Sequence, residues 1–504
     1  MSEFLNSLTE FISFVNTDIL WGIPMIVAVL GTGILITVRT RALQVRRFGY
    51  AVSNTIIPTV RNMTKKRGGK RRDGEKTISQ FEAFSAAISG TVGTGNIVGV
   101  AGALLSGGPG AVFWMWVSAF FGLVTNYAEN VLGIYFRRRD NSGNVSGGPM
   151  YYISGGLRAH WLAMIFSLCC LLAAVGMGMV QTNSMSGVIQ NVVTGGDGTS
   201  AVTAWIVGIA VAAVTALIVI GGIKRIGRVA SMIVPFMALL FIVMALTIII
   251  VNITSVPSVF ALIFTSAFSL RSVAGGFFGY MVMTGMRYGF ARGVFSNEAG
   301  LGSSVIAHSA SDTKEPVVQG LWGIFGVFLD TFVICTLTAL SLMSCGIYDF
   351  TAISENAEAG IQQSEVAISA FLDTFGRAGS VIFAIILPLF AFTTIIAWSY
   401  YGEKAAEYLF GKRHGRAAAM VFKTVYVLLL PVGAVVSSEL VWQLDDMFNA
   451  MMALPNLIAL IVMSGLVARI SKNYFDRRAG LDIEPMLSAY VKERETDDGG
   501  IDKN

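Results

Sequence analysis

Apolar runs of about 20 residues follow one another along most of this chain, and they constrain its fold more than any other feature. A run of that length crosses the hydrocarbon core of a bilayer, about 30 Å, as an α-helix. Lipid offers the backbone no hydrogen-bond partner, so a spanning segment must satisfy its own backbone. Composition agrees, because only 13% of the residues are charged, against roughly 25% in soluble proteins. We therefore expect an all-α protein that crosses the membrane many times.

Hydropathy, read with breaks at proline, glycine and charged clusters, predicts eleven spans. They cover residues 18–38, 79–105, 110–135, 161–191, 201–221, 228–251, 279–309, 316–344, 379–410, 417–437 and 441–470. The sequence ahead of the first span, MSEFLNSLTEF, lacks the basic segment of a cleavable signal, so this span is expected to be retained.

Lysine and arginine are concentrated in the loops on one side of these spans. Twelve of them lie between Arg39 and Lys76. Smaller groups follow at 137–139, 224–228, 412–416 and 477–478. The opposite loops, 190–200, 252–278 and 345–378, contain only Arg271 and Arg377. The positive-inside rule then predicts a plasma (inner) membrane protein with its N-terminus outside and its C-terminus in the cytoplasm.

The span count predicts an internal repeat. Without the first span ten remain, and two sets of five have opposite membrane orientation because five is odd. This is the pattern of a 5+5 inverted-repeat bundle with one extra N-terminal helix. The expected parts are an extracellular N-terminus with the extra helix (1–38), a basic cytoplasmic loop (39–78), a first repeat (79–251), an extracellular connection (252–278), a second repeat (279–470) and a cytoplasmic tail (471–504).

The first span of each repeat is interrupted by glycine, in SGTVGTGN (89–96) and in FSNEAGLGSS (295–304). Each glycine costs a helix interior about 1 kcal/mol relative to alanine. Paired glycine-interrupted spans at corresponding positions indicate the midplane site of a transporter. The third spans carry polar patches as well, GMVQTNS (178–184) and FTTIIAW (392–398). We expect the first helix to open near Gly90–Gly95; the alternative is close helix packing through Gly95 and Gly99.

Several longer motifs then identify a family. GTVGTGNIVGVAGALLSGGPGAVFWMW, GGPMYYI, ARGVFSNEAGLGSSVIAHSA, DTFVICTLTAL and FAFTTIIAWSYYGEKAAEYLFG together resemble the alanine/glycine:cation symporter family, and the match runs from about residue 79 to 470. That family is similar in fold to the bacterial leucine transporter, with broken first and sixth core helices. The resemblance implies inward transport of alanine or glycine with sodium.

The resemblance also implies roles for the first broken segment. Ser89 and Val92 correspond to residues whose carbonyls bind sodium. The substrate is expected to lie beside the residues between and after them, Thr91, Thr94, Gly95 and Asn96. Freed N–H groups suit the carboxylate of an amino acid, because the N-terminus of a half-helix favours negative charge.

The eighth core span is the second part of the expected sodium site. The Phe390 carbonyl with the Thr393 and Thr394 hydroxyls reproduces an i, i+3, i+4 spacing that the similar fold uses for sodium. Two hydroxyls in an apolar helix can instead donate to carbonyls one turn earlier. Trp398, one turn beyond Thr394, is a candidate wall of the substrate pocket.

The second broken segment supplies further candidates. Asn297 offers a donor and an acceptor to a zwitterion, and Phe295 can close over a small side chain. A carboxylate at this depth costs at least about 2.5 kcal/mol. Glu298 is therefore expected to act as a structural lock, paired with Arg292 or Arg287 or bound by the unwound segment.

Other polar residues inside spans have open roles. Gln181 either links helices or reaches the substrate. Asp330 lies near a cation, is a protonatable coupling residue, or pairs with a neighbouring polar group. Glu82 and Glu129, near span ends, are expected at a gate or at the surface.

These observations predict a sodium-coupled symporter that imports alanine or glycine by alternating access. The alternative is a proton-coupled carrier of the same fold that uses Asp330 or Glu298. No nucleotide-binding, zinc or Ser-His-Asp motif occurs, so we expect no enzyme activity and no cofactor. The expected partners are the amino acid, sodium and the lipid bilayer, with no nucleic acid.

Overall fold

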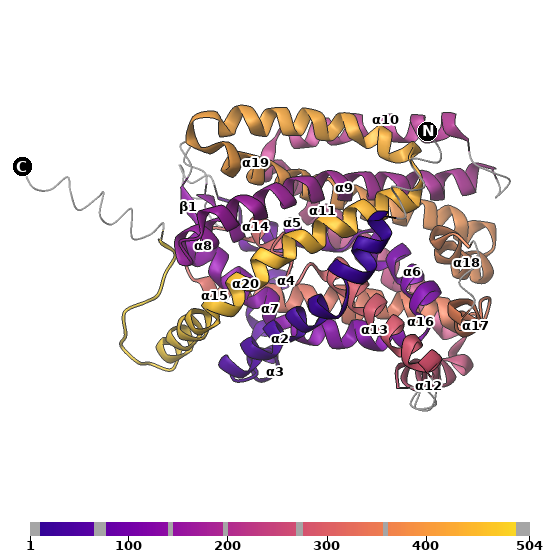
Figure 1. The fold of residues 1–504 in the computed structure, drawn as a ribbon, viewed down its shortest axis with the longest axis horizontal. Helices are drawn as coiled ribbons and strands as arrows, with labels where there is room; N and C mark the ends of the chain where they lie inside the picture. The colour runs from indigo at the N-terminus through magenta and orange to yellow at the C-terminus, as the bar shows by residue number, and fades with distance from the viewer. Residues whose placement is uncertain are drawn as a thin grey trace, which may run out of the picture.

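The computed structural model describes residues 11–64, 77–139, 145–194, 200–268, 276–355 and 361–489. Most helices run along one direction of an elongated bundle (Figure 1). The elements are η1 (Val15–Leu20), α2 (Ile23–Arg39), α3 (Leu43–Arg46), α4 (Phe48–Thr64), α5 (Gln80–Thr91), η2 (Thr94–Asn96), α6 (Val98–Gly107), α7 (Gly110–Phe136), β1 (Arg138–Arg139), β2 (Val145–Ser146), α8 (Pro149–Gly156), α9 (His160–Thr194), α10 (Ala201–Val219), α11 (Gly222–Val251), η3 (Ile253–Ser255), α12 (Val256–Ala267), α13 (Gly276–Asn297), α14 (Ser304–His308), α15 (Pro316–Val327), η5 (Phe328–Cys335), α16 (Thr336–Ser344), α17 (Phe350–Glu355), α18 (Gln363–Phe375), α19 (Arg377–Val435) and α20 (Ser438–Arg478).

Eight helices among the described residues are long and apolar enough to cross a membrane. Their ranges are Gly110–Phe136, His160–Val193, Ala201–Val219, Gly222–Val251, Pro316–Ser344, Arg377–Gly411, Arg413–Val435 and Ser438–Arg478. The other three predicted spans correspond to the shorter helix α2 and to two interrupted pairs, α5 with α6 and α13 with α14. The long element α19 bends at Gly411, where φ is +65°, so it contains two of the predicted spans.

Several segments between the spans contain helices that hydropathy did not predict. The connection at 252–278 includes α12, and the loop at 345–378 includes α17 and α18. The basic loop contains α3 and α4 up to Thr64, while its residues 65–76 lie outside the described part of the chain. These helices are short or carry charged and polar residues, so a search for long apolar runs passes over them.

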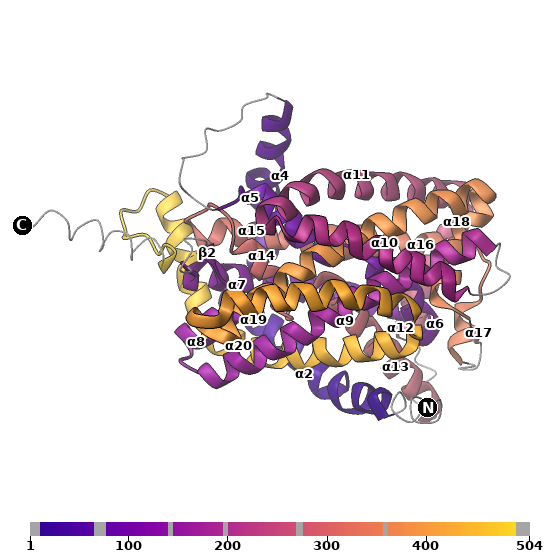
Figure 2. The same cartoon turned by 90° about the horizontal axis from the view of Figure 1, so that it is seen from above.

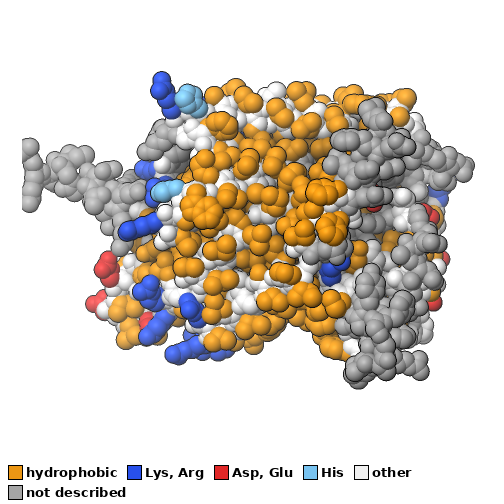
Figure 3. All heavy atoms as spheres, in the orientation of Figure 1, with side chains coloured by type: hydrophobic (Ala, Val, Ile, Leu, Met, Phe, Trp, Pro, Cys, Tyr) orange, Lys and Arg blue, Asp and Glu red, His pale blue; other side chains and the backbone are white. Residues whose placement is uncertain are grey.

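Basic side chains gather at one end of the molecule, and hydrophobic side chains cover the face between the ends (Figure 3). The same end holds β1, α8 and the bend of α19, whereas α12, α17 and α18 lie at the opposite end (Figure 1). The loops that the sequence places on the basic side therefore lie together.

Arg137 is fully buried and links α7 to the loop after α14 and to the C-terminal tail at this basic end. Its guanidinium donates to the carbonyls of Ser309 at 3.1 Å and Ser311 at 2.6 Å, and to that of Thr313. Its Nε donates to Ser488 Oγ at 2.9 Å. Because α20 continues to Arg478, the C-terminal tail begins at Ala479, and its described part packs against the loop that follows α14.

Long helices enclose the two interrupted pairs. Helix α9 packs along α19 and α20, and α7 packs on α13 and α15. Figure 2, seen from above, shows α9, α19 and α20 side by side. The broken segments of the two repeats pack against each other inside the bundle, since α13 contacts α6 and η2, and α14 contacts α5.

Candidate substrate and ion site

The first helix of the first repeat opens after Thr91. Its N-terminus is fixed by Ser79 and Glu82, which accept each other's backbone N–H groups in a capping box. The chain leaves the helix at Val92 and Gly93, makes the single turn of η2, and resumes at Val98. This confirms the predicted opening, and it shows Glu82 as the capping residue of α5.

Backbone donors in this opening are redirected to side chains. In a continuous helix the N–H groups of Gly93 and Thr94 would bond to the carbonyls of Ser89 and Gly90. Gly93 N–H instead donates to Asn96 Oδ1 at 2.8 Å, and Thr94 N–H donates to Gln181 Oε1 at 3.1 Å. The Asn96 N–H donates to the Gly93 carbonyl at 3.3 Å rather than to that of Val92. The carbonyls of Ser89, Gly90 and Val92 are thereby released from the helix ladder.

The corresponding helix of the second repeat opens after Asn297. Glu298, Gly300 and Gly302 all have positive φ, at 56°, 96° and 78°. Glycine adopts such angles without strain; Glu298 adopts one without that freedom and is buried. The N–H of Ala299 donates to Asn297 Oδ1 at 3.0 Å, and that of Gly300 donates to Glu129 Oε1 at 2.9 Å.

Asp330 joins the two openings. Its Oδ1 accepts a hydrogen bond from Asn96 Nδ2 at 2.6 Å. Its Oδ2 accepts from Ser296 Oγ at 2.8 Å and from Thr331 Oγ at 2.9 Å. Asn96 Nδ2 also lies 2.8 Å from Ser296 Oγ, and Asn297 Nδ2 donates to Thr331 Oγ at 3.0 Å. One buried carboxylate therefore contacts polar groups from both broken helices and from its own helix.

Asp330 lies in η5, a π-helical stretch between α15 and α16. Such stretches are frequent at functional sites, because the wider turn changes which way side chains project. Of the three roles open for Asp330, pairing with neighbouring polar groups is present in this structure. A cation beside it or a proton on it stays a prediction.

The predicted sodium residues on α19 lie beside the first opening. Thr393 Oγ and Thr394 Oγ both donate to the Phe390 carbonyl, at 2.9 and 3.1 Å. A Cβ built on Gly93 would contact Thr394 Oγ. Thr393 Oγ also lies 3.5 Å from Met237 Sδ of α11. The hydroxyls thus have the back-bonded geometry of the simpler interpretation, and Thr394 in addition faces the freed backbone.

Glu298 accepts a hydrogen bond from the unwound segment, which is one of its three predicted alternatives; the alternative pairing with Arg292 is wrong. Its two carboxylate oxygens accept from Ser303 Oγ at 2.5 Å and from Trp398 Nε1 at 2.9 Å. Arg292 pairs with Asp446 instead. Trp398 is therefore fixed by the second opening, and its predicted role as a pocket wall stays a prediction. Gln181 links α9 to η2 through the Thr94 N–H.

The sequence predicts Glu129 at a gate or at the surface, and a position at the surface is wrong. Its side chain is fully buried, and Oε1 accepts from Gly300 N–H at 2.9 Å and from Asn456 Nδ2 at 2.6 Å. Asn456 also donates to the Gly300 carbonyl at 2.9 Å. Glu129 and Asn456 therefore hold the backbone of the second opening.

A cover of aromatic and charged side chains lies against the first opening. A Cβ built on Gly95 would lie 3.0 Å from the Phe295 ring. The Phe295 ring centroid is 5.2 Å from that of Trp442, and the Arg292 guanidinium lies over both rings, at 5.4 and 5.0 Å. Arg292 binds both carboxylate oxygens of Asp446, at 3.0 and 2.7 Å. Bidentate arginine–carboxylate pairs are strong and fixed in geometry.

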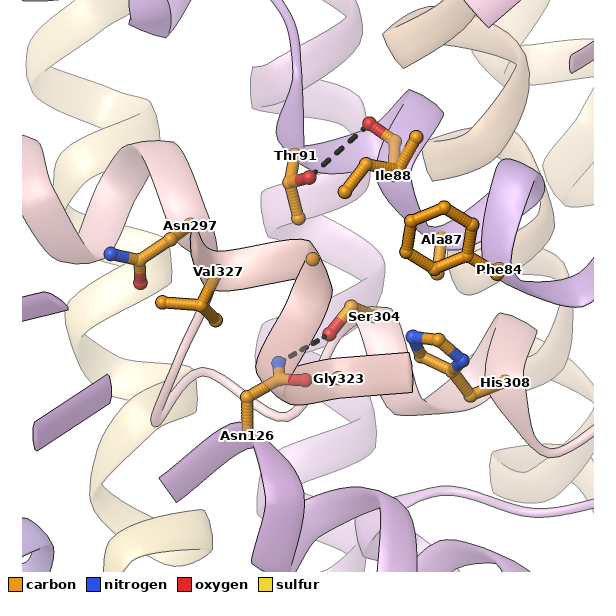
Figure 4. Close-up of a pocket in the computed structure, with 11 residues that line it drawn as sticks. Phe84, Ala87, Ile88, Thr91, Asn126, Asn297, Ser304, His308, Gly323 and Val327 are labelled. Atoms are coloured by element: carbon orange, nitrogen blue, oxygen red, sulfur yellow. Dashed lines mark hydrogen bonds between the residues drawn. The ribbon is translucent and has the colours of Figure 1, made fainter. Parts of the chain in front are cut away.

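A small cavity lies beside the two openings, with Thr91 and Asn297 in its wall (Figure 4). Its volume is about 10 Å³, roughly the space of one water molecule. Thr91 and Asn297, both predicted substrate contacts, line it together with residues of α5, α7, α14 and α15. Figure 4 shows Phe84 and His308 on one side of it and Asn297 and Val327 on the other.

Comparison with known proteins now identifies the chain. The family model described as sodium:alanine symporter family matches residues 5–486. The chain belongs to the sodium:alanine symporter family. It is a multi-pass membrane transport protein of an amino-acid symporter family and not an enzyme.

Two relatives with assigned activities are similar to this chain along nearly their whole length. The sodium/alanine symporter AgcS of Methanococcus maripaludis is 41% identical, over 93% of this chain and 98% of that protein. The amino-acid carrier protein AlsT of Bacillus subtilis is 34% identical, over 96% of this chain and 95% of that protein. Among solved structures, MhsT in complex with L-phenylalanine matches 79% of this chain with a TM-score of 0.55 at 13% identity. That likeness confirms the leucine-transporter fold.

The sequence predicted the two openings but not all of the residues that hold them in place. It placed candidates on the right segments, since Ser89–Asn96, Phe295, Asn297, Asp330 and Thr394 all lie around the openings. It missed Ser296, Thr331, Asp446, Trp442 and Asn456. The intramembrane charge of Asp446 and the amide of Asn456 inside an apolar span could have indicated two of these, whereas Ser296, Thr331 and Trp442 are ordinary residues of such spans.

Proposed function

We propose that this protein is a sodium-coupled symporter that imports alanine or glycine across the plasma (inner) membrane. One observation supports it most: two broken helices from opposite repeats meet at Asp330, and the first of them releases backbone carbonyls while its N–H groups are bonded by side chains. Hydrocarbon tolerates free backbone groups only where they line a cavity or bind a ligand. The activity of the relative AgcS, sodium/alanine symport, agrees with that use.

The proposed sodium site combines freed carbonyls with hydroxyls. The carbonyls of Ser89, Val92 and Phe390 and the hydroxyls of Thr393 and Thr394 supply oxygen ligands, which a hard cation prefers. Thr394 and Gly93 are close enough that a side chain on Gly93 would meet the hydroxyl. Sodium in this position ties α19 to the first opening.

The proposed amino-acid site uses the remaining groups of the openings. Its residues are Thr91, Thr94, Gly95, Asn96, Gln181, Phe295, Asn297 and Trp398. Phe295 rests against Gly95, so little room exists for a large side chain, which favours alanine and glycine. Asp330 holds the two openings together through Asn96 and Ser296 and is the proposed coupling residue.

Sodium supplies the driving force in this proposal. One positive charge that enters with the membrane potential gains about 2.3 kcal/mol per 100 mV, which supports roughly fiftyfold accumulation at a 1:1 ratio. Direction follows from orientation, which we propose as N-terminus outside and C-terminus in the cytoplasm. The basic side chains at one end of the molecule favour that orientation.

The alternative is a proton-coupled carrier of the same fold, and reconstituted protein distinguishes the two. We expect liposomes to accumulate labelled alanine when an inward sodium gradient is imposed at equal pH. Glycine is expected to compete with alanine. Accumulation driven by a proton gradient in the absence of sodium would contradict the sodium proposal and favour the alternative.

A further inference from the structure

A carboxyl group without a counter-charge lies next to the Arg292–Asp446 pair. Asp445 precedes Asp446 in α20 and is fully buried. Arg292 binds Asp446, and no ion pair of the described residues includes Asp445. The other ionisable groups near Asp445 are Glu298 and Tyr426, neither of which carries a positive charge. An ion buried without a partner is so costly that such a group generally takes up a proton and becomes neutral.

Two buried oxygens at this position lack a hydrogen-bond donor. Asp445 Oδ2 accepts from Asn449 Nδ2 at 3.1 Å, whereas Asp445 Oδ1 has no partner among the described residues. Asn449 is also fully buried, and in the same part of the chain its Oδ1 has no partner either. Side chains four positions apart lie on one face of a helix. A single hydrogen between the two side chains therefore satisfies both oxygens.

Helix α9 closes this position to larger ligands. A Cβ built on Gly176 would lie 2.8 Å from Asp445 Oδ1 and 3.2 Å from the Asp445 Cα. The Tyr426 hydroxyl already donates to the Ile395 carbonyl at 2.8 Å, so it supplies no donor to the carboxyl group. A metal cation takes about six oxygen ligands, whereas Asp445 and its amide neighbour offer one unpartnered side-chain oxygen each. A proton needs no more than these two.

We propose that Asp445 binds a proton on Oδ1 and shares it with Asn449 Oδ1. The two side chains then make paired hydrogen bonds, one from Asn449 Nδ2 to Asp445 Oδ2 and one from the protonated Oδ1 to Asn449 Oδ1. The step adds one proton from solution to the carboxylate, which becomes a neutral carboxylic acid, and it needs no other reactant. The pair then contains no buried charge and no unpartnered oxygen.

The proton on Asp445 stabilises the cover over the first opening. Arg292 lies over the Phe295 and Trp442 rings, and its guanidinium binds Asp446. Loss of the proton places a second negative charge one residue from Asp446, which repels that carboxylate and attracts the guanidinium away from the rings. The cover is thereby sensitive to pH whichever ion drives transport, which goes beyond the proposed function.

Infrared spectroscopy of the purified protein in liposomes tests the proton directly. A protonated carboxyl group has a carbonyl stretching band that a carboxylate lacks. Asp445→Asn preserves both hydrogen bonds, because the new amide donates to Asn449 Oδ1 and accepts from Asn449 Nδ2. At neutral pH we expect Asp445→Asn to remove one protonated-carboxyl band and the matched variant Asp446→Asn to remove a carboxylate band. Loss of a carboxylate band in Asp445→Asn would overturn the proposal.

Alanine uptake tests the effect on the cover. Asp445→Asn is permanently neutral and is expected to retain the uptake and the unfolding temperature of the wild type at neutral pH. Asp446→Asn leaves Arg292 without its counter-charge and is expected to lower uptake at least about tenfold. As the pH rises, wild-type uptake is expected to fall where the infrared band disappears, and uptake by Asp445→Asn is not.

The other outcomes are decisive as well. A loss of uptake in Asp445→Asn equal to that in Asp446→Asn would show that Asp445 acts as an ion and overturn the proton site. Equal pH profiles for the wild type and Asp445→Asn would overturn the role in the cover. If wild-type liposomes take up neither alanine nor glycine, the proposed function fails, and the infrared bands still decide whether Asp445 holds a proton.

Discussion

Asn96 Nδ2 donates a hydrogen bond to Asp330 Oδ1 at 2.6 Å, between residues 234 positions apart in the chain. Through its Oδ1, the same Asn96 accepts the Gly93 N–H and holds the first opening in shape. Through Ser296, Asp330 reaches the end of α13 where the second opening begins. Three side chains, Asn96, Asp330 and Ser296, therefore connect the two openings by hydrogen bonds.

Asp330→Asn tests this connection. The carboxylate accepts hydrogen bonds from Asn96, Ser296 and Thr331. An amide has one acceptor oxygen and two N–H groups, so it places a donor against donors. We expect sodium-driven alanine uptake to fall at least about fivefold, because a buried unsatisfied polar group costs about 1–3 kcal/mol. Asp373→Asn, at an exposed position of α18, is the control and should leave uptake unchanged.

The sequence predicted where the helices break because the local cause is in the residues themselves. Gly93, Gly95, Gly300 and Gly302 weaken helices, and the paired positions of these glycines in the two repeats distinguish a site from packing. The partners of the openings depend on tertiary contacts instead. Glu129 accepts a hydrogen bond from Asn456, 327 positions away in the chain, and no local sequence pattern predicts that pair.

Arg292 shows how such an error arises. From sequence its nearest acidic partner is Glu298, six positions away, whereas in the fold Asp446 of α20 binds it from 154 positions away. The π-helical turn around Asp330 was also out of reach, because its residues fit an ordinary apolar helix.

Thr394→Ala tests the proposed sodium site. Loss of one oxygen ligand should raise the half-saturating sodium concentration several-fold, while alanine affinity at saturating sodium changes less. Thr424→Ala is the matched control, because the Thr424 hydroxyl is exposed and donates to the Met420 carbonyl with the same back-bonded geometry, at 3.1 Å. An unchanged sodium dependence in Thr394→Ala would count against this hydroxyl as a ligand.

Gly93→Ala tests whether the first opening needs a residue without a side chain. A Cβ there would contact Thr394 Oγ and lie 3.2 Å from Gln181 Oε1, which already accepts the Thr94 N–H. Overpacking of this kind costs about 1–3 kcal/mol. We expect a lower unfolding temperature and loss of alanine uptake. Gly31→Ala in α2, where a Cβ meets no atom within 4 Å, should change neither; normal uptake by Gly93→Ala would show that the opening tolerates a side chain.

Arg137→Met tests the connection at the basic end. The guanidinium satisfies the carbonyls of Ser309, Ser311 and Thr313, which follow directly after α14. Ile78, just before α5, pairs with this loop, since its N–H donates to the Ala310 carbonyl at 3.1 Å. The start of α5 and the end of α14 therefore meet at one loop. Removal of the Arg137 guanidinium leaves the buried carbonyls of this loop without donors.

For Arg137→Met we expect faster amide hydrogen exchange over residues 303–313 and at the start of α5, because local opening there becomes less costly. Arg225→Met is the control, since Arg225 is exposed and bonds to the Leu217 carbonyl of the preceding helix. Exchange in the Arg137 variant equal to that of the control would show that the loop after α14 is held by other contacts. If exchange rises only in the tail after Ala479, Arg137 fixes the tail through Ser488 without closing the basic end of the bundle.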